Sequence, residues 1–164
     1  MKTKTTFCLM IFMIFISASP IRSQTSPFSG DWKLNREKTN LQGSQLFLSK
    51  IKAELKSDSL LTTRTYENGN GEEYPFVENL SLDGKDSKII IYEMPRTSKA
   101  SFSQGDGTIN LESTTVFTGN NGEDNFKAKE TWKIEDGGNI LSIAFTASSS
   151  AGSTTGTQYF DKVK

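Results

Sequence analysis

Beyond residue 30 the chain alternates apolar and polar residues with a period of two, and short glycine-containing turns interrupt the alternation. A two-residue period is typical of β-strands with one buried face, and Asp-Gly or Asn-Gly pairs favour tight hairpins. Such pairs stand at 83–84, 106–107, 121–122 and 136–137. The pattern predicts an all-β domain, an antiparallel up-and-down β-barrel of about 8–10 strands.

The turns also predict the register of the last strands. If each Gly-containing pair is a two-residue loop, the residues on either side of it must lie opposite one another. The rule predicts these cross-strand pairs: Trp132–Leu141, Glu130–Ile143, Ala128–Phe145, Phe117–Phe126 and Phe102–Leu111. All three turns then place the same set of side chains on one inner face, which is the agreement expected of a foldable sequence.

This inner face is the candidate ligand site. Large apolar side chains fill one level, and small or polar ones occupy the levels beside it. An inward carboxylate needs a partner or water, and small residues leave space. We therefore interpret the face as the lining of a cavity; the alternative is a filled core in which Glu130 is hydrogen-bonded to Ser113. The candidate ligand-binding residues are Glu130, Trp132, Ser113, Thr115, Phe117, Phe126, Ile143, Phe145 and Arg96.

Arg96 is the one basic residue among these candidates. The predicted register places it close to one rim of the barrel, opposite Phe117. A guanidinium group in that position would favour an acidic or carboxylate ligand.

The first 24 residues have the composition of a secretory signal. Lys2 and Lys4 precede an unbroken apolar run, Phe7–Ile16, and small residues follow it. The run is shorter than the roughly 20 residues that span a bilayer. We expect residues 1–24 to be a cleaved signal peptide and residues 25–164 to be one β-barrel domain. The protein is then secreted or periplasmic, without stable membrane insertion.

Removing this segment changes the chemistry of the chain. Cys8 is lost with it, and 16 basic and 19 acidic side chains remain. A mildly acidic protein without a basic patch is not expected to bind nucleic acid. An exported domain without disulfides fits a bacterial periplasm or exterior.

The chain contains no histidine, which excludes serine–histidine triads, most zinc sites and His-ligated haem. The runs at 68–73 and 120–124 hold oxygen atoms that suit calcium but lack the EF-hand spacing, so they are interpreted as turns. We expect no metal, no cofactor and no enzymatic activity. A carboxylate-based hydrolase that uses Glu130 with Glu78 or Glu93 is the remaining enzymatic alternative.

The segment that follows the signal carries a family resemblance. Gly30-Asp31-Trp32, followed by a meander that ends in a basic strand, resembles the lipocalin and calycin arrangement. The stretches GDWKLNREKTN and TWKIEDGGNILSI also resemble small secreted bacterial lipocalin-like proteins. The resemblance implies a barrel that encloses a small apolar molecule. It also implies that Trp32 packs beneath one end and that Lys162 or Lys164 covers its indole, where the family usually has arginine.

The closing role of this segment also has a physical basis. A glycine at position 30 lets the chain bend into the barrel, and a buried indole needs an acceptor for its N–H group. Gly30, Trp32 and Lys162 are therefore the candidate barrel-closing residues.

The leading functional hypothesis is a monomeric, non-enzymatic binding protein for a small hydrophobic or amphipathic ligand held inside the barrel. The alternative is a structural or protein-interaction module with a filled barrel. In that case the Ser/Thr-rich segment 147–157 is the expected contact surface.

Overall fold

The computed structural model describes residues 26–40, 46–119 and 122–164, so the predicted signal peptide lies outside the described residues. The described chain forms strands β1 (Gly30–Leu34), β2 (Leu46–Leu55), β3 (Ser59–Asn68), β4 (Glu73–Ser81), β5 (Ser87–Ile91), β6 (Met94–Ser103), β7 (Thr108–Gly119), β8 (Gly122–Glu135), β9 (Ile140–Ser149) and β10 (Gly152–Lys162). A single 3-10 turn, η1 (Asp136–Gly138), joins β8 to β9. In the part of the chain that the structure describes, no helix has the length and apolar character needed to span a membrane.

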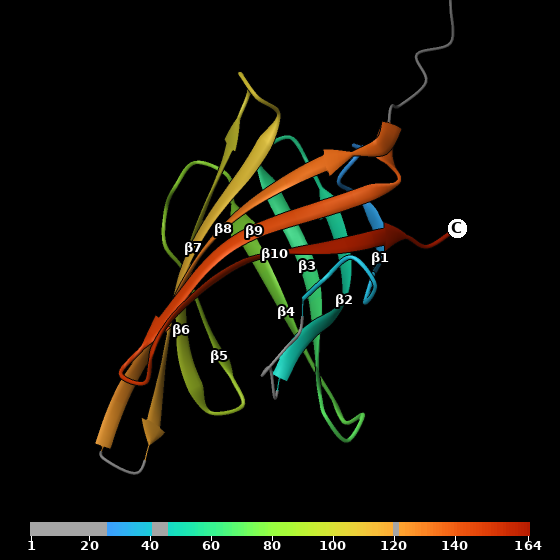
Figure 1. The fold of residues 1–164 in the computed structure, drawn as a ribbon. Coiled ribbons are helices and arrows are strands. Elements are labelled where there is room, and N and C mark those ends of the chain that lie inside the picture. Colours follow the sequence, from blue (N-terminus) through green and yellow to red (C-terminus); the bar gives the residue numbers. More distant parts are fainter. Residues whose placement is uncertain (1–25, 41–45, 120–121) are drawn as a thin grey trace, which may run out of the picture.

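The strands form one antiparallel sheet in the order β4-β3-β2-β1-β10-β9-β8-β7-β6-β5. Because β1 pairs with β10, the two halves of the chain are joined and the sheet curls into a nearly closed barrel (Figure 1). The predicted fold class, an up-and-down antiparallel β-barrel, is confirmed.

The up-and-down order gives the barrel two distinct ends. At one end lie the start of β1, the end of β10 and the connections at 56–58, 82–86, 104–107 and 136–139. At the other lie the turns at 69–72, 92–93 and 150–151, together with the end of β7 and the start of β8. We call these the closed end and the open end; they are at the top and the bottom of Figure 1.

The barrel has a seam between β4 and β5. The predicted tight hairpin at Asp83-Gly84 is wrong, because the connection spans 82–86 and the two strands share no ladder. The connection binds β6 instead: Asp83 forms a bridge with Ser101, and the Gly84 N–H donates to the Ala100 carbonyl at 2.9 Å. Side chains hold the seam, where the Tyr92 hydroxyl donates to the Pro75 carbonyl at 2.7 Å.

The predicted registers of β6 to β9 are each wrong by two residues. Trp132 lies opposite Ile143 instead of Leu141, and Glu130 lies opposite Phe145 instead of Ile143. The remaining observed pairs are Ala128–Ala147, Thr115–Phe126, Phe117–Asp124 and Ala100–Leu111, with Phe102 opposite Ile109 and Arg96 opposite Thr115.

The cause of these errors is loop length. The connections at 104–107 and 136–139 are four residues long, and β8 begins at Gly122 instead of after it. Asp136 and Gly137 have φ angles of 48° and 62°, and the Asn139 N–H closes the turn on the Asp136 carbonyl at 3.2 Å. Because a strand has a period of two, a shift of two residues leaves every side chain on its predicted face.

The apolar core fills the closed half of the barrel. Its largest fully buried side chains include both tryptophans, and Leu60, Leu80, Ile109, Leu141 and Phe160 surround them. Along β3 and β4 the inward residues change from leucine at the closed end to Arg64 and Glu78 further along, and to Tyr66 and Phe76 at the open end. The core therefore gives way to polar and aromatic side chains within the same barrel.

Candidate functional site

Gly30, Trp32 and Lys162 meet at the closed end. Trp32 is buried, and its indole N–H donates to the Phe28 carbonyl at 3.0 Å. The Lys162 ammonium lies 4.9 Å from the centroid of the Trp32 ring, within range for a cation–π contact. Gly30 has a φ of +139°, and a Cβ built there would lie 2.8 Å from Lys162 Cε. A side chain at position 30 would therefore displace the lysine that covers the indole.

A buried ion pair spans the interior. Arg64 on β3 donates two hydrogen bonds of 2.8 Å to the two carboxylate oxygens of Glu130 on β8. In the strand order β3 and β8 lie half-way round the barrel from each other, so the pair joins opposite walls. Glu130 also accepts a 2.7 Å bond from the Trp132 indole. The predicted Glu130–Ser113 bond of the filled-core alternative is wrong, since Arg64 and Trp132 are the partners of this carboxylate.

Both members of this pair are held in the charged state. Burial opposes ionisation of Glu130, but the Arg64 charge and the hydrogen bonds from Arg64 and Trp132 outweigh it and lower the pKa of the carboxyl. Burial likewise opposes the charge on Arg64, and the facing Glu130 carboxylate raises the pKa of the guanidinium. A general acid needs a raised carboxyl pKa at neutral pH, so Glu130 is poorly suited to that role.

A second ion pair lies at the seam. Arg96 on β6 donates to Glu78 on β4 at 3.2 Å and to the Thr115 hydroxyl at 3.1 Å, and its guanidinium lies over the Phe76 ring. Both charged side chains are buried. Glu78 therefore balances the charge on Arg96, so the predicted binding of a carboxylate ligand by Arg96 would require that ligand to compete with Glu78.

Four buried side-chain atoms near these ion pairs have no hydrogen-bond partner among the described residues. They are Arg64 Nε, Glu78 Oε2, Ser98 Oγ and Ser113 Oγ. Ser98 and Ser113 lie directly opposite each other on β6 and β7. Buried polar atoms in native proteins are nearly always paired, and each exception requires an explanation. These atoms are positions at which a further polar partner, water or a polar group of a ligand, would bind.

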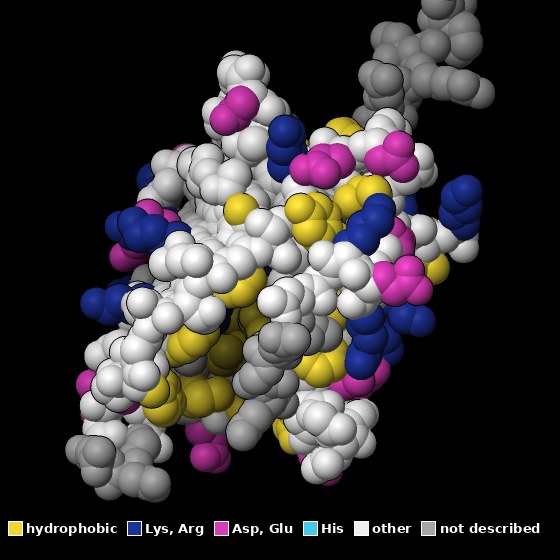
Figure 2. Space-filling model, in the orientation of Figure 1, with side chains coloured by type: hydrophobic (Ala, Val, Ile, Leu, Met, Phe, Trp, Pro, Cys, Tyr) yellow, Lys and Arg dark blue, Asp and Glu magenta, His cyan; other side chains and the backbone are white. Residues whose placement is uncertain are grey.

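Aromatic side chains line the barrel between these polar atoms and the open end. Tyr66 and Phe76 are stacked with ring centroids 6.1 Å apart, and Phe126 is 42% exposed although it belongs to the inward face of β8. Phe117 and Phe145 are partly buried. Figure 2 shows hydrophobic side chains gathered around a hollow in the lower half of the molecule.

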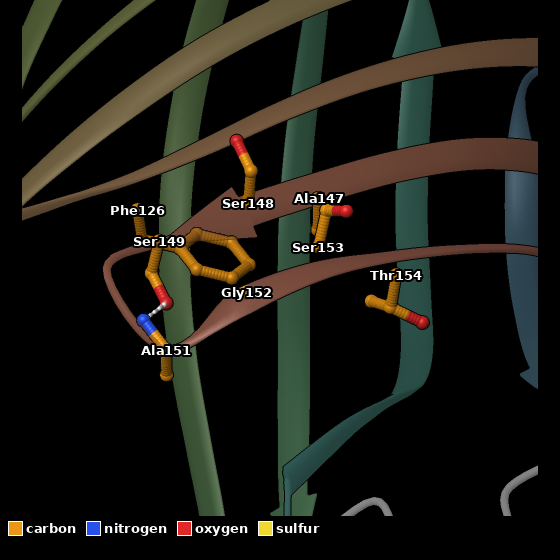
Figure 3. A pocket seen from close by; sticks show the side chains of 8 residues that line it. All are labelled: Phe126, Ala147, Ser148, Ser149, Ala151, Gly152, Ser153 and Thr154. Carbon is orange, nitrogen blue, oxygen red and sulfur yellow. Dashed lines mark hydrogen bonds between the residues drawn. The ribbon is translucent and has the colours of Figure 1, made fainter.

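A groove of about 280 Å³ opens beside Phe126 at this end. Figure 3 shows the Phe126 ring next to the β9–β10 turn, in which the Ala151 N–H donates to the Ser149 hydroxyl at 3.2 Å. The groove is lined by Phe126, Ala147, Ser148, Ser149, Ala151, Gly152, Ser153 and Thr154. Its volume is close to the lower end of the range of ligand pockets, about 300–1,000 Å³.

A second groove of about 440 Å³ lies over β8, β9 and β10. Its lining is mostly from the outward face: Lys129, Thr131, Ala144, Thr146, Thr155 and Thr157, with Gly156 and Phe145. Gly156 lies against the Phe145 ring, which would be only 3.1 Å from an added Cβ.

The predicted ligand-binding residues all belong to the inward rows of the strands, but they do not form one site. Trp132 and Ile143 are part of the closed-end core, and Glu130 is bound by Arg64. The residues nearer the open end are Ser113, Thr115, Arg96, Phe117, Phe126 and Phe145.

Sequence reasoning missed several inward residues. Arg64, Ser98, Tyr66 and Phe76 were not predicted as site residues, and Glu78 was considered only for hydrolysis. The alternation along β6 does predict that Ser98 faces inward, and the structure confirms this position. No local pattern distinguishes the two faces of β3, where Leu60 and Leu61 precede threonines on both sides.

In the described residues, two of the three carboxylates of the hydrolase alternative are held in ion pairs. Glu78 and Glu130 are each bound to a different arginine. Glu93 is exposed in the β5–β6 turn, at a φ of 67°, whereas Glu130 lies inside the barrel.

The described residues thus form a nearly closed up-and-down β-barrel, with a tryptophan under one end and a lysine over its indole. No family model matches the sequence, and no curated protein matches it.

Two solved structures share the architecture. A secretary abundant heat soluble (SAHS) protein from Ramazzottius varieornatus is 12% identical with a TM-score of 0.52, over 84% of this chain and 96% of that chain. The zebrafish ileal bile acid-binding protein, in complex with cholic acid, is 18% identical with a TM-score of 0.50, over 84% of this chain and all of the other. Both are calycin-type barrels, so the predicted lipocalin-like resemblance is confirmed for the fold.

Proposed function

We propose that this protein is a non-enzymatic, monomeric binding protein that holds a small hydrophobic or amphipathic ligand in the open half of its barrel. The observation that carries the proposal is the set of four unpartnered polar atoms buried beside aromatic side chains. Mostly apolar concave surfaces with a few polar groups are the usual form of ligand sites.

The groove beside Phe126 is the proposed entrance. It combines an aromatic ring with the small side chains of Ala147 and Ser149, and it lies at the end of the barrel opposite the Trp32 closure. A barrel of this class has been solved with cholic acid, the zebrafish bile acid-binding protein, which supports a ligand inside the present barrel.

Ligand uptake is testable with a lipophilic fluorescent probe. We expect saturable binding of one probe per chain and a change in the fluorescence of Trp132, which lies directly behind the Arg64–Glu130 pair. Failure to bind any member of a chemically diverse hydrophobic panel would contradict the proposal and favour the interaction-module alternative.

Two substitutions on β9 test whether the probe enters through the groove beside Phe126. Ala147 is buried on the inward face beside Phe126, whereas Ala144 is exposed on the outward face of the same strand. Ala147→Trp should block the entrance and weaken probe binding about tenfold or more, equivalent to about 1.4 kcal/mol. Ala144→Trp, which fills the outer groove instead, should leave the affinity unchanged. Equal effects of the two variants would place the probe elsewhere.

We also propose that the protein is exported, to the periplasm or the exterior of a cell. The proposal is supported by the basic start and the apolar run within residues 1–24. The intact mass of the protein recovered outside the cytoplasm should correspond to a chain that begins between Pro20 and Thr25. A full-length chain retained in the cytoplasm would contradict it.

A further inference from the structure

We propose that the ligand is electrically neutral and carries a hydroxyl group, an alcohol instead of a carboxylic acid or an amine. This inference rests on the proposed function. It comes from the juxtaposition of two balanced ion pairs with four unpartnered polar atoms inside the barrel.

The first argument is the charge balance of the interior. In the described part of the chain, the charged side chains of the interior are Arg64, Arg96, Glu78 and Glu130, and each arginine is bound to one glutamate. An entering carboxylate would add a buried charge with no counter-ion of its own, unless it displaced Glu130 from its bidentate pair or Glu78 from Arg96. Either displacement leaves a buried charge without its partner, which is strongly unfavourable. An amine meets the same obstacle at the two glutamates.

The second argument is the kind of hydrogen bond that remains available. Arg64 Nε can only donate, Glu78 Oε2 can only accept, and the hydroxyls of Ser98 and Ser113 can do both. A carboxylate offers acceptors alone and an ammonium group offers donors alone, whereas a hydroxyl offers both. An alcohol therefore matches the open hydrogen-bonding positions without adding charge.

The third argument is the character of the remaining lining. Next to Ser113 on the inward face lie Ala128 on β8 and, beside it, Ala147 on β9, followed by the Phe126 ring at the entrance. This surface offers contact to an apolar skeleton. The polar group of such a ligand would be directed inward and its hydrocarbon part toward the open end.

The test compares three ligands that differ only in their polar group: dodecanol, dodecanoate and dodecylamine. Each competes with a bound fluorescent probe at neutral pH. We expect dodecanol to compete about tenfold or more better than either charged compound. Tighter binding of dodecanoate would overturn the inference while leaving the proposed function in place. If neither the probe nor any of the three compounds binds, the proposed function fails and this inference fails with it.

One substitution should weaken or reverse the preference for dodecanol over dodecanoate. Glu78→Gln keeps the size of the side chain and leaves the Arg96 charge unbalanced, so dodecanoate should gain affinity relative to dodecanol. Glu112→Gln is the matched control, because Glu112 pairs with Lys129 at 2.7 Å on the outer surface. The control should keep the wild-type order. If Glu78→Gln keeps the wild-type ratio of dodecanol to dodecanoate affinity, the charge argument is contradicted.

A second variant tests the hydrogen-bonding argument without altering charge. Ser98→Ala combined with Ser113→Ala removes two buried hydroxyls that have no partner in the described residues. The free protein should keep its stability or gain some, because no hydrogen bond is lost. Dodecanol should bind several-fold more weakly, while the lipophilic fluorescent probe binds as before. Unchanged affinity for dodecanol would overturn this part of the inference.

Discussion

The two ends of this barrel differ in how their polar groups are satisfied. At the closed end, the Trp32 indole has an acceptor in Phe28 and a cation over its face, within an apolar core. Toward the open end, arginines, glutamates and serines are buried with atoms that have no partner in the described residues. One half of the fold therefore pairs its buried polar groups within the chain, whereas the other half buries polar atoms that the proposed ligand would bind.

The largest expected effect concerns the ion pair between the two halves. Arg64→Met leaves Glu130 buried without its cation and should lower the free energy of unfolding by about 3–5 kcal/mol. Arg36→Met is the control: Arg36 binds Glu67 at 2.7 Å, but its side chain is 58% exposed. Exposed pairs contribute less than about 1 kcal/mol. Urea denaturation measures the free energy of unfolding of both variants. Equal losses would contradict the claim that the buried pair contributes more than the exposed one.

An intermediate effect is expected at the closed end. Gly30→Ala places a Cβ against Lys162 at a φ that side chains rarely adopt, which should cost about 1–3 kcal/mol. Gly69→Ala is the control, because a Cβ at position 69 has no neighbour within 4 Å. Thermal unfolding should show a loss only for the first variant. An equal loss of thermal stability in Gly30→Ala and Gly69→Ala would contradict the requirement for glycine at position 30.

A smaller effect, confined to acid, is expected from the titration of Glu130. Its pKa is lowered in the folded protein by the Arg64 charge and by two hydrogen-bond donors, against the effect of burial. The pair therefore stabilises the fold above the ordinary carboxyl pKa of about 4.3, and this stabilisation is lost as the pH falls through the lowered value. The double variant Arg64→Met with Glu130→Leu should show a flatter decline of unfolding free energy below pH 4.5 or so. If the free energy of unfolding falls with pH equally steeply in the wild-type protein and the double variant, Glu130 is not the source of this acid sensitivity.

The sequence predicts the faces of the strands better than their pairing. The alternation in β7, β8 and β9 correctly identifies inward residues such as Ser113, Glu130 and Phe145, because side-chain direction depends only on parity. The register depends on loop length, and Asp136-Gly137 belongs to a four-residue loop instead of a two-residue one. The predicted neighbours were therefore wrong while the predicted inner face was right.

The polar half of the site depends on contacts that no local pattern reveals. Arg64 and Glu130 are 66 positions apart and meet only because β3 and β8 face each other across the barrel. Glu78 and Arg96 meet because β4 and β5 form a seam instead of the predicted hairpin. Sequence patterns report on burial along one strand, whereas these pairs depend on the closure of the whole sheet.

Native mass spectrometry of the protein purified without denaturation tests the central claim most directly. We predict one small neutral molecule bound per chain, lost from Ala147→Trp and retained by Ala144→Trp. Wild-type protein that is free of any bound molecule, and that stays so after incubation with dodecanol and other hydrophobic compounds, would contradict it.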